Sequence, residues 1–461
     1  MTTTIERPTA KPAGVMSARY RALSIGLLAL VTLQAFEGMA VTTAMPVVAR
    51  DLDGMYLYNL AFSATLAASV IATVLGGRWS DVRGPLQPIG AGVLAFLAGL
   101  LLAGFAPTME LFVLGRFVQG LGIGSTQVAL YVLIARTYPA ALHPRVFALF
   151  SAAWVVPSMV GPSIAGFVAE SWDWRAIFLG VTVLVIPAAL LLWRGTTGGV
   201  VAEGIDAGPA PGLGRKLVFA ALTAVAAALI QYGSALKLAG LPLLAAGVVL
   251  LVVSLPKLLL PGSLRAARGL PTAPLLRGLA FGSYTAAEVL IPLMLKYERG
   301  LSVTAAGVVL TIGALGWSTG SWIKGRGMIG NMAALRGGGL LIAGGISLVT
   351  LVLIDSVPLL VAHVGMAAVG LGIGVLHPTV SVLVLQLSKE GEEGNNSAAV
   401  GVGESVFTVV AVAVSGALFT ATAENYAFGL IFTVGLALLG AVLAPRFVHS
   451  ATAGTMETSP S

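Results

Sequence analysis

Apolar runs long enough to cross a lipid bilayer follow one another along the whole chain. A helix needs about 20 residues to span roughly 30 Å of hydrocarbon. Fourteen runs meet this length, near 20–48, 56–77, 86–106, 109–135, 145–169, 174–194, 216–236, 238–257, 274–296, 302–323, 337–355, 358–387, 398–422 and 426–445. A single helix satisfies its own backbone hydrogen bonds in lipid. The sequence therefore predicts an all-α integral membrane protein with 14 transmembrane helices.

The composition excludes the main alternatives. Hydrophobic residues make up 57% of the chain and charged residues only 10%, which no water-soluble globular domain matches. The net charge of +7 would suggest a nucleic-acid partner in a soluble protein, but here the basic residues follow the loops, so we expect none. Cysteine is absent, which rules out disulfides and thiol chemistry.

The basic residues also predict an orientation. With the N-terminus inside, twenty Lys and Arg, Arg277 among them, fall in inner segments, five fall outside, and Arg116 lies within a span. This asymmetry, together with an even number of spans, predicts that both termini are cytoplasmic. Residues 1–17 lack the apolar core and cleavage site of a signal peptide, so the first span should be retained in a multi-pass protein of the inner, cytoplasmic membrane.

Two short patterns recur at nearly the same offset. "GRWSDVRG" at 77–84 resembles "GSWIKGRG" at 320–327, and "GLGIG" occurs at 120–124 and 370–374, giving offsets of 243 and 250. They predict two related six-helix bundles in tandem, which in transporters bind substrate between the halves. The expected parts are a tail (1–19), a bundle (20–194), a linker (195–215), two extra helices (216–257), a second linker (258–273), a second bundle (274–445) and a tail (446–461).

No phosphate-binding loop of the form G-x-x-x-x-G-K-[ST] occurs, and the glycine-rich motifs lie inside apolar runs. We therefore expect no ATP, no cofactor and no metal, and a proton gradient as the energy source. We expect the chain to be a monomer surrounded by membrane lipid.

Several motifs together resemble the major facilitator superfamily, and are most similar to its fourteen-span drug:proton antiporter branch. They are "GRWSDVRG", "GRFVQGLG" at 115–122, "VVPSMVGPSIAGF" at 155–167, "FEGMAVTTAMP" at 36–46 and "WDWRAIF" at 172–178. The resemblance covers roughly residues 20–445. It implies the major facilitator fold, two pseudo-symmetric six-helix bundles with two additional helices between them.

Five ionisable residues within spans are candidates for proton coupling: Glu37, Arg116, Glu288, His377 and Glu404. A carboxyl group that is neutral when dry and charged when wet can carry a proton. For Glu37 the alternative is a protonated acid bonded to a neighbouring helix, and for Arg116 a side chain that reaches the outer interface. For His377 the alternative is a cap at a kink, and Glu404 fits an inner gate as well as substrate contact.

The loop after the second span is a candidate conformational latch, formed by Gly77, Asp81, Arg83 and Gly84. A carboxylate there can cap the positive N-terminus of a helix from the other half. "NNSAAVG" at 395–401 is a plausible start of that helix, with Asn396 or Ser397 as N-cap. The equivalent position of the second half is Lys324, which would repel a helix N-terminus, so the latch should be asymmetric.

Two further sets of residues are assigned by their position in the spans. Small residues and a proline should let helices pack closely or bend: Gly120, Gly124, Gly161, Pro162, Gly166, Gly370 and Gly374. Residues that could line a substrate cavity, or equally pack in the core or against lipid, are Phe36, Met39, Gln119, Trp154, Tyr284 and Met294.

The function expected from these features is proton-coupled export of hydrophobic or amphipathic compounds by alternating access, as in multidrug efflux, and not an enzymatic activity. The alternatives are a dedicated lipid or natural-product exporter, or an importer, of the same fold. A channel or membrane enzyme would need a charged ring or a catalytic cluster, and the sequence shows neither.

Overall fold

The structure is a computed structural model that describes residues 14–196, 213–235, 237–301, 303–422 and 425–456. All of its regular elements in these ranges are helical, and fourteen helices are long and apolar enough to span a membrane, as expected. The expected linker at 195–215 and both expected tails lie largely or partly outside the described residues. The α-helices are α1 (Arg21–Asp51), α2 (Tyr58–Arg83), α3 (Leu86–Gly104), α4 (Met109–Thr137), α5 (His143–Ser171), α6 (Arg175–Thr196), α7 (Leu213–Ala235), α8 (Leu241–Leu258), α9 (Ala273–Tyr297), α10 (Val303–Gly325), α11 (Asn331–Leu351), α12 (Leu360–Leu387), α13 (Glu393–Ala421) and α14 (Tyr426–Met456). Short 3₁₀ turns are η1 (Met55–Leu57), η2 (Ala140–Leu142), η3 (Lys237–Gly240), η4 (Ser263–Arg265) and η5 (Leu270–Thr272).

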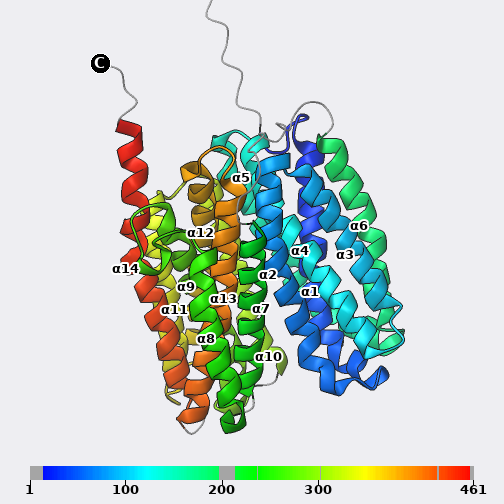
Figure 1. Cartoon of the computed structure of the whole chain (residues 1–461). Coiled ribbons are helices and arrows are strands. Elements are labelled where there is room, and N and C mark those ends of the chain that lie inside the picture. Colours follow the sequence, from blue (N-terminus) through cyan, green and yellow to red (C-terminus); the bar gives the residue numbers. More distant parts are fainter. Residues whose placement is uncertain (1–13, 197–212, 236, 302, 423–424, 457–461) are drawn as a thin grey trace, which may run out of the picture.

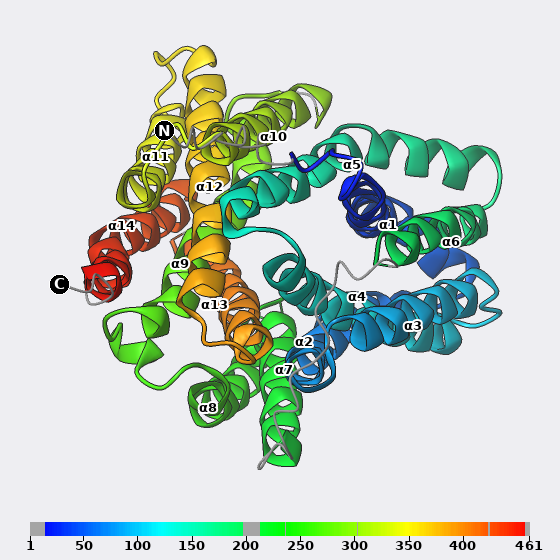
Figure 2. The same cartoon turned by 90° about the horizontal axis from the view of Figure 1, so that it is seen from above.

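The helices form two bundles around separate cores. One core is built almost entirely from α1 to α6, and the other from α9 to α14. We call these bundles the N-half and the C-half; they lie side by side in Figure 2. α1 begins and α14 ends at the same end of the molecule, which we call the terminal end (Figure 1).

The two "GLGIG" motifs occupy equivalent places in the halves. A Cβ added to Gly120 would meet the carbonyl oxygen of Thr65, and one added to Gly370 would meet that of Gly313, each closer than atoms can approach. Only glycine therefore allows α4 to pack against α2 and α12 against α10 at this distance. Gly124 and Gly374 make the same kind of contact one turn further on.

The α5 motif behaves differently. A Cβ on Gly161 would lie 3.4 Å from the Cβ of Met39, and one on Gly166 would lie 3.7 Å from Thr43, both ordinary contacts. The expectation that these glycines let α1 and α5 approach too closely for a side chain is wrong, because a methyl group would fit at either position without a collision. Pro162 lies inside α5, as expected.

The two extra helices lie at the seam between the halves. α7 packs against both α2 and α13, and α8 packs against α7 (Figure 2). A third apolar cluster holds them there, and its buried members are Val70, Val74, Ala220, Leu255, Leu258, Leu259, Val402 and Val406. The surplus pair thus contacts each half instead of being attached to one.

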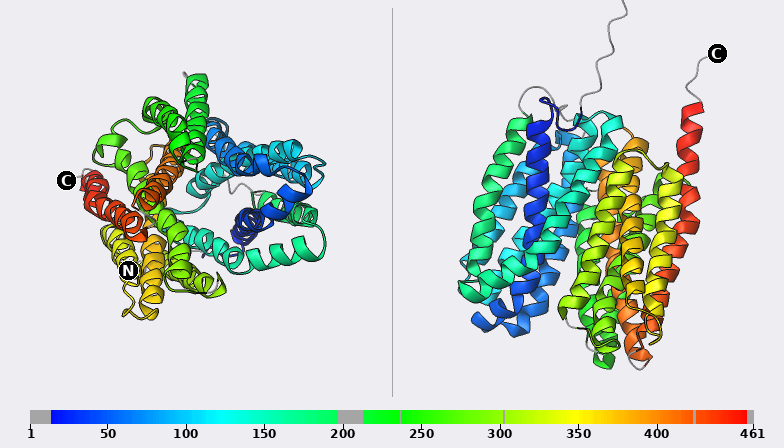
Figure 3. Two further views of the ribbon diagram at one scale, coloured as in Figure 1. Left: turned by 90° about the horizontal axis from the view of Figure 1, so that it is seen from below. Right: turned by 180° about the vertical axis from the view of Figure 1, so that it is seen from behind.

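On the opposite face of the molecule α5 packs against α10, as the view from below in Figure 3 also shows. A Cβ on Gly325, at the end of α10, would lie 2.7 Å from the Cβ of Ala148 near the start of α5. This close contact lies at the terminal end, because α5 begins and α10 ends there.

Candidate functional site

A buried ion pair joins α1 to α4 in the middle of the N-half. The Glu37 carboxylate pairs with the Arg116 guanidinium, and the two residues are only 1% and 4% exposed. Arg116 Nη1 also donates to Gln119 Oε1 at 2.7 Å. Arg116 therefore reaches inward and not to the outer interface, and Glu37 does not face lipid.

The C-half holds a second buried ion pair. Its arginine, Arg277, lies at a different place from the one that the sequence predicts. Arg277 was expected in an inner segment, but α9 begins at Ala273 and carries Arg277 into the bundle, where it is 3% exposed. Its guanidinium pairs with the Glu404 carboxylate of α13, whose Oε2 lies 3.5 Å from His377 Nε2 of α12. Arg277 lies only four positions past the start of its helix, so a count of basic residues assigns it to the preceding loop. The sequence therefore predicts only its acidic partner, Glu404, as a site residue.

The C-half pair also reaches across to the N-half. Arg277 donates through Nη1 to the Ser381 hydroxyl at 3.0 Å and through Nη2 to the Tyr131 hydroxyl at 3.2 Å. Tyr131 belongs to α4, so this hydrogen bond crosses the interface between the halves. An arginine has enough donors to hold a carboxylate, a serine and a tyrosine at once.

The remaining candidate acid, Glu288, has a different environment. Its carboxylate accepts a hydrogen bond from the Tyr284 hydroxyl at 3.0 Å. Tyr284 packs edge-on against Trp317, whose ring centroid is 5.3 Å away, in a cluster that also contains Phe281 and His377. Glu288 is thus bonded within α9, whereas Glu404 is the acid of the C-half that pairs with an arginine.

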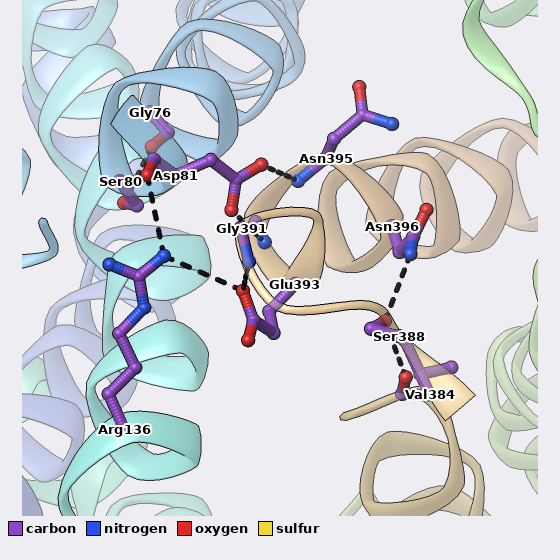
Figure 4. Close-up of polar contacts among 11 residues, drawn as sticks. Gly76, Ser80, Asp81, Arg136, Val384, Ser388, Gly391, Glu393, Asn395 and Asn396 are labelled. Atoms are coloured by element: carbon purple, nitrogen blue, oxygen red, sulfur yellow. Dashed lines mark hydrogen bonds and ion pairs between the residues drawn. The ribbon is translucent and has the colours of Figure 1, made fainter. Parts of the chain in front are cut away.

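Asp81 makes the contact across the halves that its position predicts. Its two carboxylate oxygens accept hydrogen bonds from the backbone amides of Gly394 and Asn395, at 2.7 and 2.8 Å (Figure 4). Both amides belong to the first turn of α13, where amides lack partners within the helix. Gly77 and Gly394 allow the close approach, because a Cβ on either would collide with the backbone of the other helix.

Two details of the expected latch are corrected. α13 begins at Glu393, one turn before the expected start, so neither Asn396 nor Ser397 is its N-cap. Arg83 is exposed, because a residue two positions after Asp81 points to another side of α2. The guanidinium at the latch is that of Arg136 in α4, which lies 3.5 Å from the Glu393 carboxylate and 3.4 Å from the Asp81 carbonyl oxygen (Figure 4). Gly84 ends α2 with φ 80°, a conformation that favours glycine.

The equivalent position of the second half does not form such a contact. Lys324 Nζ donates to the Asn331 side chain at 2.6 Å and to the Ile329 carbonyl at 3.2 Å, both within its own loop. On this face the halves meet by the packing of α10 against α5. The terminal end is therefore joined by a charged contact on one face and by close packing on the other.

The residues expected to line a substrate cavity scatter in the structure. Met294 is fully buried in the C-half core, so it lines no cavity in this conformation, and Gln119 is buried against Arg116. Tyr284 is buried beside Glu288, and Trp154 is 47% exposed on α5. Phe36 and Met39 are half-buried on the side of α1 that faces Gly161.

A cleft of about 190 Å³ opens at a different place, between α2, α7, α9 and α13. We call it the seam cleft. Glu404 forms part of its wall, and the other lining residues are Ser63, Leu66, Ala67, Val70, Ala224, Ala227, Ala228, Gln231, Phe281, Ser405, Val406, Thr408 and Val409. Sequence analysis does not predict it, because its walls are ordinary apolar faces of four helices that are far apart in the chain.

The structure thus has two six-helix bundles, a buried ion pair in each, and a helix start that is capped across their interface. The comparison with known families agrees with this architecture. The family described as the Major Facilitator Superfamily matches residues 27–411. The chain belongs to this superfamily. It is a multi-pass membrane transporter of small molecules, not an enzyme.

Relatives and solved structures of the superfamily are similar over most of the chain. The multidrug transporter protein MdtP of Bacillus subtilis is 26% identical over 80% of this chain and 70% of its own length. An uncharacterised transporter of Mycobacterium tuberculosis is 26% identical over 93% of this chain but only 63% of its own length. The crystal structure of the human organic anion transporter MFSD10 aligns with a TM-score of 0.69 over 92% of this chain and 99% of that one, at 13% identity. The proton:xylose symporter XylE aligns with a TM-score of 0.66 over 93% and 96%, at 16% identity. These two structures support the fold.

Proposed function

We propose that the protein is a proton-coupled exporter of hydrophobic or amphipathic compounds that works by alternating access. The observation that carries the proposal is one buried carboxylate–guanidinium pair in each half, Glu37 with Arg116 and Glu404 with Arg277. A charge within a span costs about 2.5–3.5 kcal/mol on insertion scales, so such groups are rare unless they have a function. Protonation of either acid would leave its arginine without a counter-charge.

The chemistry of an unpaired buried arginine gives the coupling. Leaving one partner of a buried pair uncompensated costs about 3–5 kcal/mol, and hydration removes that cost. Arg277 lies in the second turn of α9, near the terminal end, and is held there by Tyr131 of the other half. A proton on Glu404 would therefore favour a state in which the terminal end opens and water reaches Arg277.

The conformation fits one stage of such a cycle. The contacts of Asp81 with α13 and of Gly325 with α5 close the terminal end. In the other half of α1, an exposed stripe runs along one side of the helix at Gly38, Thr42, Pro46 and Arg50. With the terminal end in the cytoplasm, as the distribution of Lys and Arg favours, this is an outward-facing state, ready to take a proton from outside.

The cargo class rests on the relatives. The relative MdtP is named a multidrug transporter. The same machinery would serve a dedicated exporter of one lipid or natural product, which differs only in cargo.

The test is transport by the purified protein in proteoliposomes. With the vesicle interior made acidic, the wild-type chain should accumulate a lipophilic fluorescent dye, and a protonophore should abolish the accumulation. Glu404→Gln and Glu37→Gln should lose the dependence on the pH gradient, whereas Asp355→Asn, an exposed acid at the other end of the molecule, should keep it. Transport of no compound in a broad panel, or equal transport with and without the gradient, would refute the proposal.

A further inference from the structure

The seam cleft extends from one buried acid, Glu404, toward the end of the molecule opposite the terminal end. Glu404 lies near the middle of α13, and its side chain is 16% exposed, more than the 1% of Glu37. Gln231 lies in the last turns of α7 and Ser63 in the second turn of α2, so both lie toward the opposite end. The cleft joins the two levels, since all three residues line it.

Polar groups are spaced along this route. The Ser63 hydroxyl donates to the Gln231 side-chain oxygen at 3.5 Å. Thr408 follows Glu404 by four residues and so lies on the same face of α13, one turn toward the opposite end. The Thr408 hydroxyl is buried and has no hydrogen-bond partner among the described residues, although it lines the cleft. A turn of the Thr408 side chain about χ1 would present this unsatisfied hydroxyl to water in the cleft.

The size of the cleft fits a short chain of water molecules. At roughly 30 Å³ for each molecule, a volume of about 190 Å³ holds about six. Water needs two to four polar partners to be stable in such a place. Ser63, Gln231, Thr408 and Glu404 can supply them.

The charged groups around Glu404 define what a proton arriving there would do. Arg277 faces it from α9 and His377 from α12, while Tyr131 of α4 contacts Arg277 from the other side. From α2 and α7 the cleft contributes Ser63 and Gln231, neither of which titrates in the physiological range. Among the described residues that line the cleft, Glu404 is the one acid and none is a base, so a proton delivered through the cleft meets Glu404 first.

We propose that the seam cleft is the path by which protons from outside reach Glu404, and that the extra helix α7 forms one wall of this path. In the step itself, a proton from the outside solution is relayed along the water chain, which is left unchanged, and adds to the Glu404 carboxylate; the carboxylate becomes a carboxylic acid, and Arg277 loses its counter-charge. This inference rests on the proposed function, since it names the entry route of the coupling proton. It also gives the surplus pair a role, because α2 and α13 alone would leave this side of the route open to lipid.

The test fills the cleft without touching the ion pair. Ala227→Leu combined with Ala228→Leu places two larger side chains in its α7 wall, and Val225→Leu, at a position 50% exposed on α7, is the matched control. The measured quantity is the rate of Glu404 protonation. It is followed as the appearance of the carboxylic acid band in the infrared spectrum after the outside of the proteoliposomes is acidified. Glu404→Gln identifies the band.

The filled cleft should slow this protonation by roughly tenfold or more, because the water chain is broken, with the final amplitude unchanged, and the control should match the wild type. Thr408→Val, which removes a hydroxyl and keeps the shape, should slow it by a smaller factor. Protonation of the filled variant at the wild-type rate overturns the inference, as does a wild-type protein that transports without any Glu404 band. A wild-type protein without gradient-driven transport defeats the proposed function instead, so the two failures are distinct.

Discussion

Replacing Asp81 by Asn should shift the protein toward the state that is open at the terminal end. Asp81 accepts two backbone hydrogen bonds from α13, at 2.7 and 2.8 Å, and is fully buried. Asn keeps one acceptor oxygen but turns an amide NH₂ toward the second donor, so one bond to a charged group is lost, at about 1.5–3 kcal/mol. The loss of negative charge at a helix N-terminus adds about 0.3–2 kcal/mol.

These terms sum to about 2–5 kcal/mol in favour of the open terminal end. Because 1.4 kcal/mol is tenfold in an equilibrium, even about 2 kcal/mol changes the ratio of the two states by about thirtyfold. Such a change is large enough to convert a minor conformer into the major one.

The measurement can use the chain as it is, because it contains no cysteine. Arg83→Cys and Lys389→Cys place one exposed label in each half at the terminal end, and electron-spin distances between them report its opening. The wild-type pair should give mainly a short distance and the Asp81→Asn pair a larger long-distance population. Asp355→Asn, exposed at the other end, should leave the distribution unchanged.

A distance distribution of Asp81→Asn equal to that of the wild type would refute the reasoning. It would mean that the contact between Asp81 and the start of α13 does not hold the halves together. A shift in both Asp81→Asn and Asp355→Asn would equally count against it, since the effect would then follow net charge and not this contact.

Three other changes have definite expected outcomes. Tyr131→Phe removes the acceptor that holds Arg277 across the interface, so the same pair of labels should show more opening, by about 1.5–3 kcal/mol; an unchanged distribution would show that this bond does not hold the halves. Glu37→Gln leaves Arg116 buried without a counter-charge and should destabilise the protein by about 3–5 kcal/mol. A lower melting temperature in detergent would report this loss, and adding Arg116→Gln should recover part of it. Gly370→Leu should prevent folding, because a Cβ there meets the Gly313 carbonyl, while Gly161→Ala should be tolerated; size-exclusion profiles of the two variants test this difference.

The sequence predicted the fold well because the signal is carried by length and composition. A helix that crosses a bilayer must be about 20 residues long and apolar, so the fourteen runs and the fourteen helices coincide. The repeated "GLGIG" was interpretable for a similar reason, since close helix packing requires a residue without a side chain. The contact of Asp81 could be predicted because a carboxylate interacts favourably with the positive N-terminus of a helix.

The partners within the site could not be predicted, because they depend on rotation and depth of helices far apart in the chain. Arg277 and Glu404 are 127 positions apart, and whether their side chains meet depends on how α9 and α13 turn toward each other. Arg136 and Arg83 looked alike as basic residues near loops, yet only the first contacts Glu393. The N-cap prediction failed since α13 begins one turn early, with Asp81 of the other half bonding its free amides.

The extra pair of helices connects these features. Near the start of α7, Lys216 Nζ donates to the Asn395 side chain at 2.7 Å, and Asn395 is the residue whose amide Asp81 holds. Near its other end, Gln231 meets Ser63 of α2 beside the seam cleft. α7 therefore bonds to the C-half at the terminal end and to the N-half at the opposite end. If the halves rock about the seam, these two bonds cannot both keep their lengths while α7 stays rigid. One of them must break as the terminal end opens, and the Lys216 bond, which shares Asn395 with the latch, is the one that the opening of the latch disturbs first.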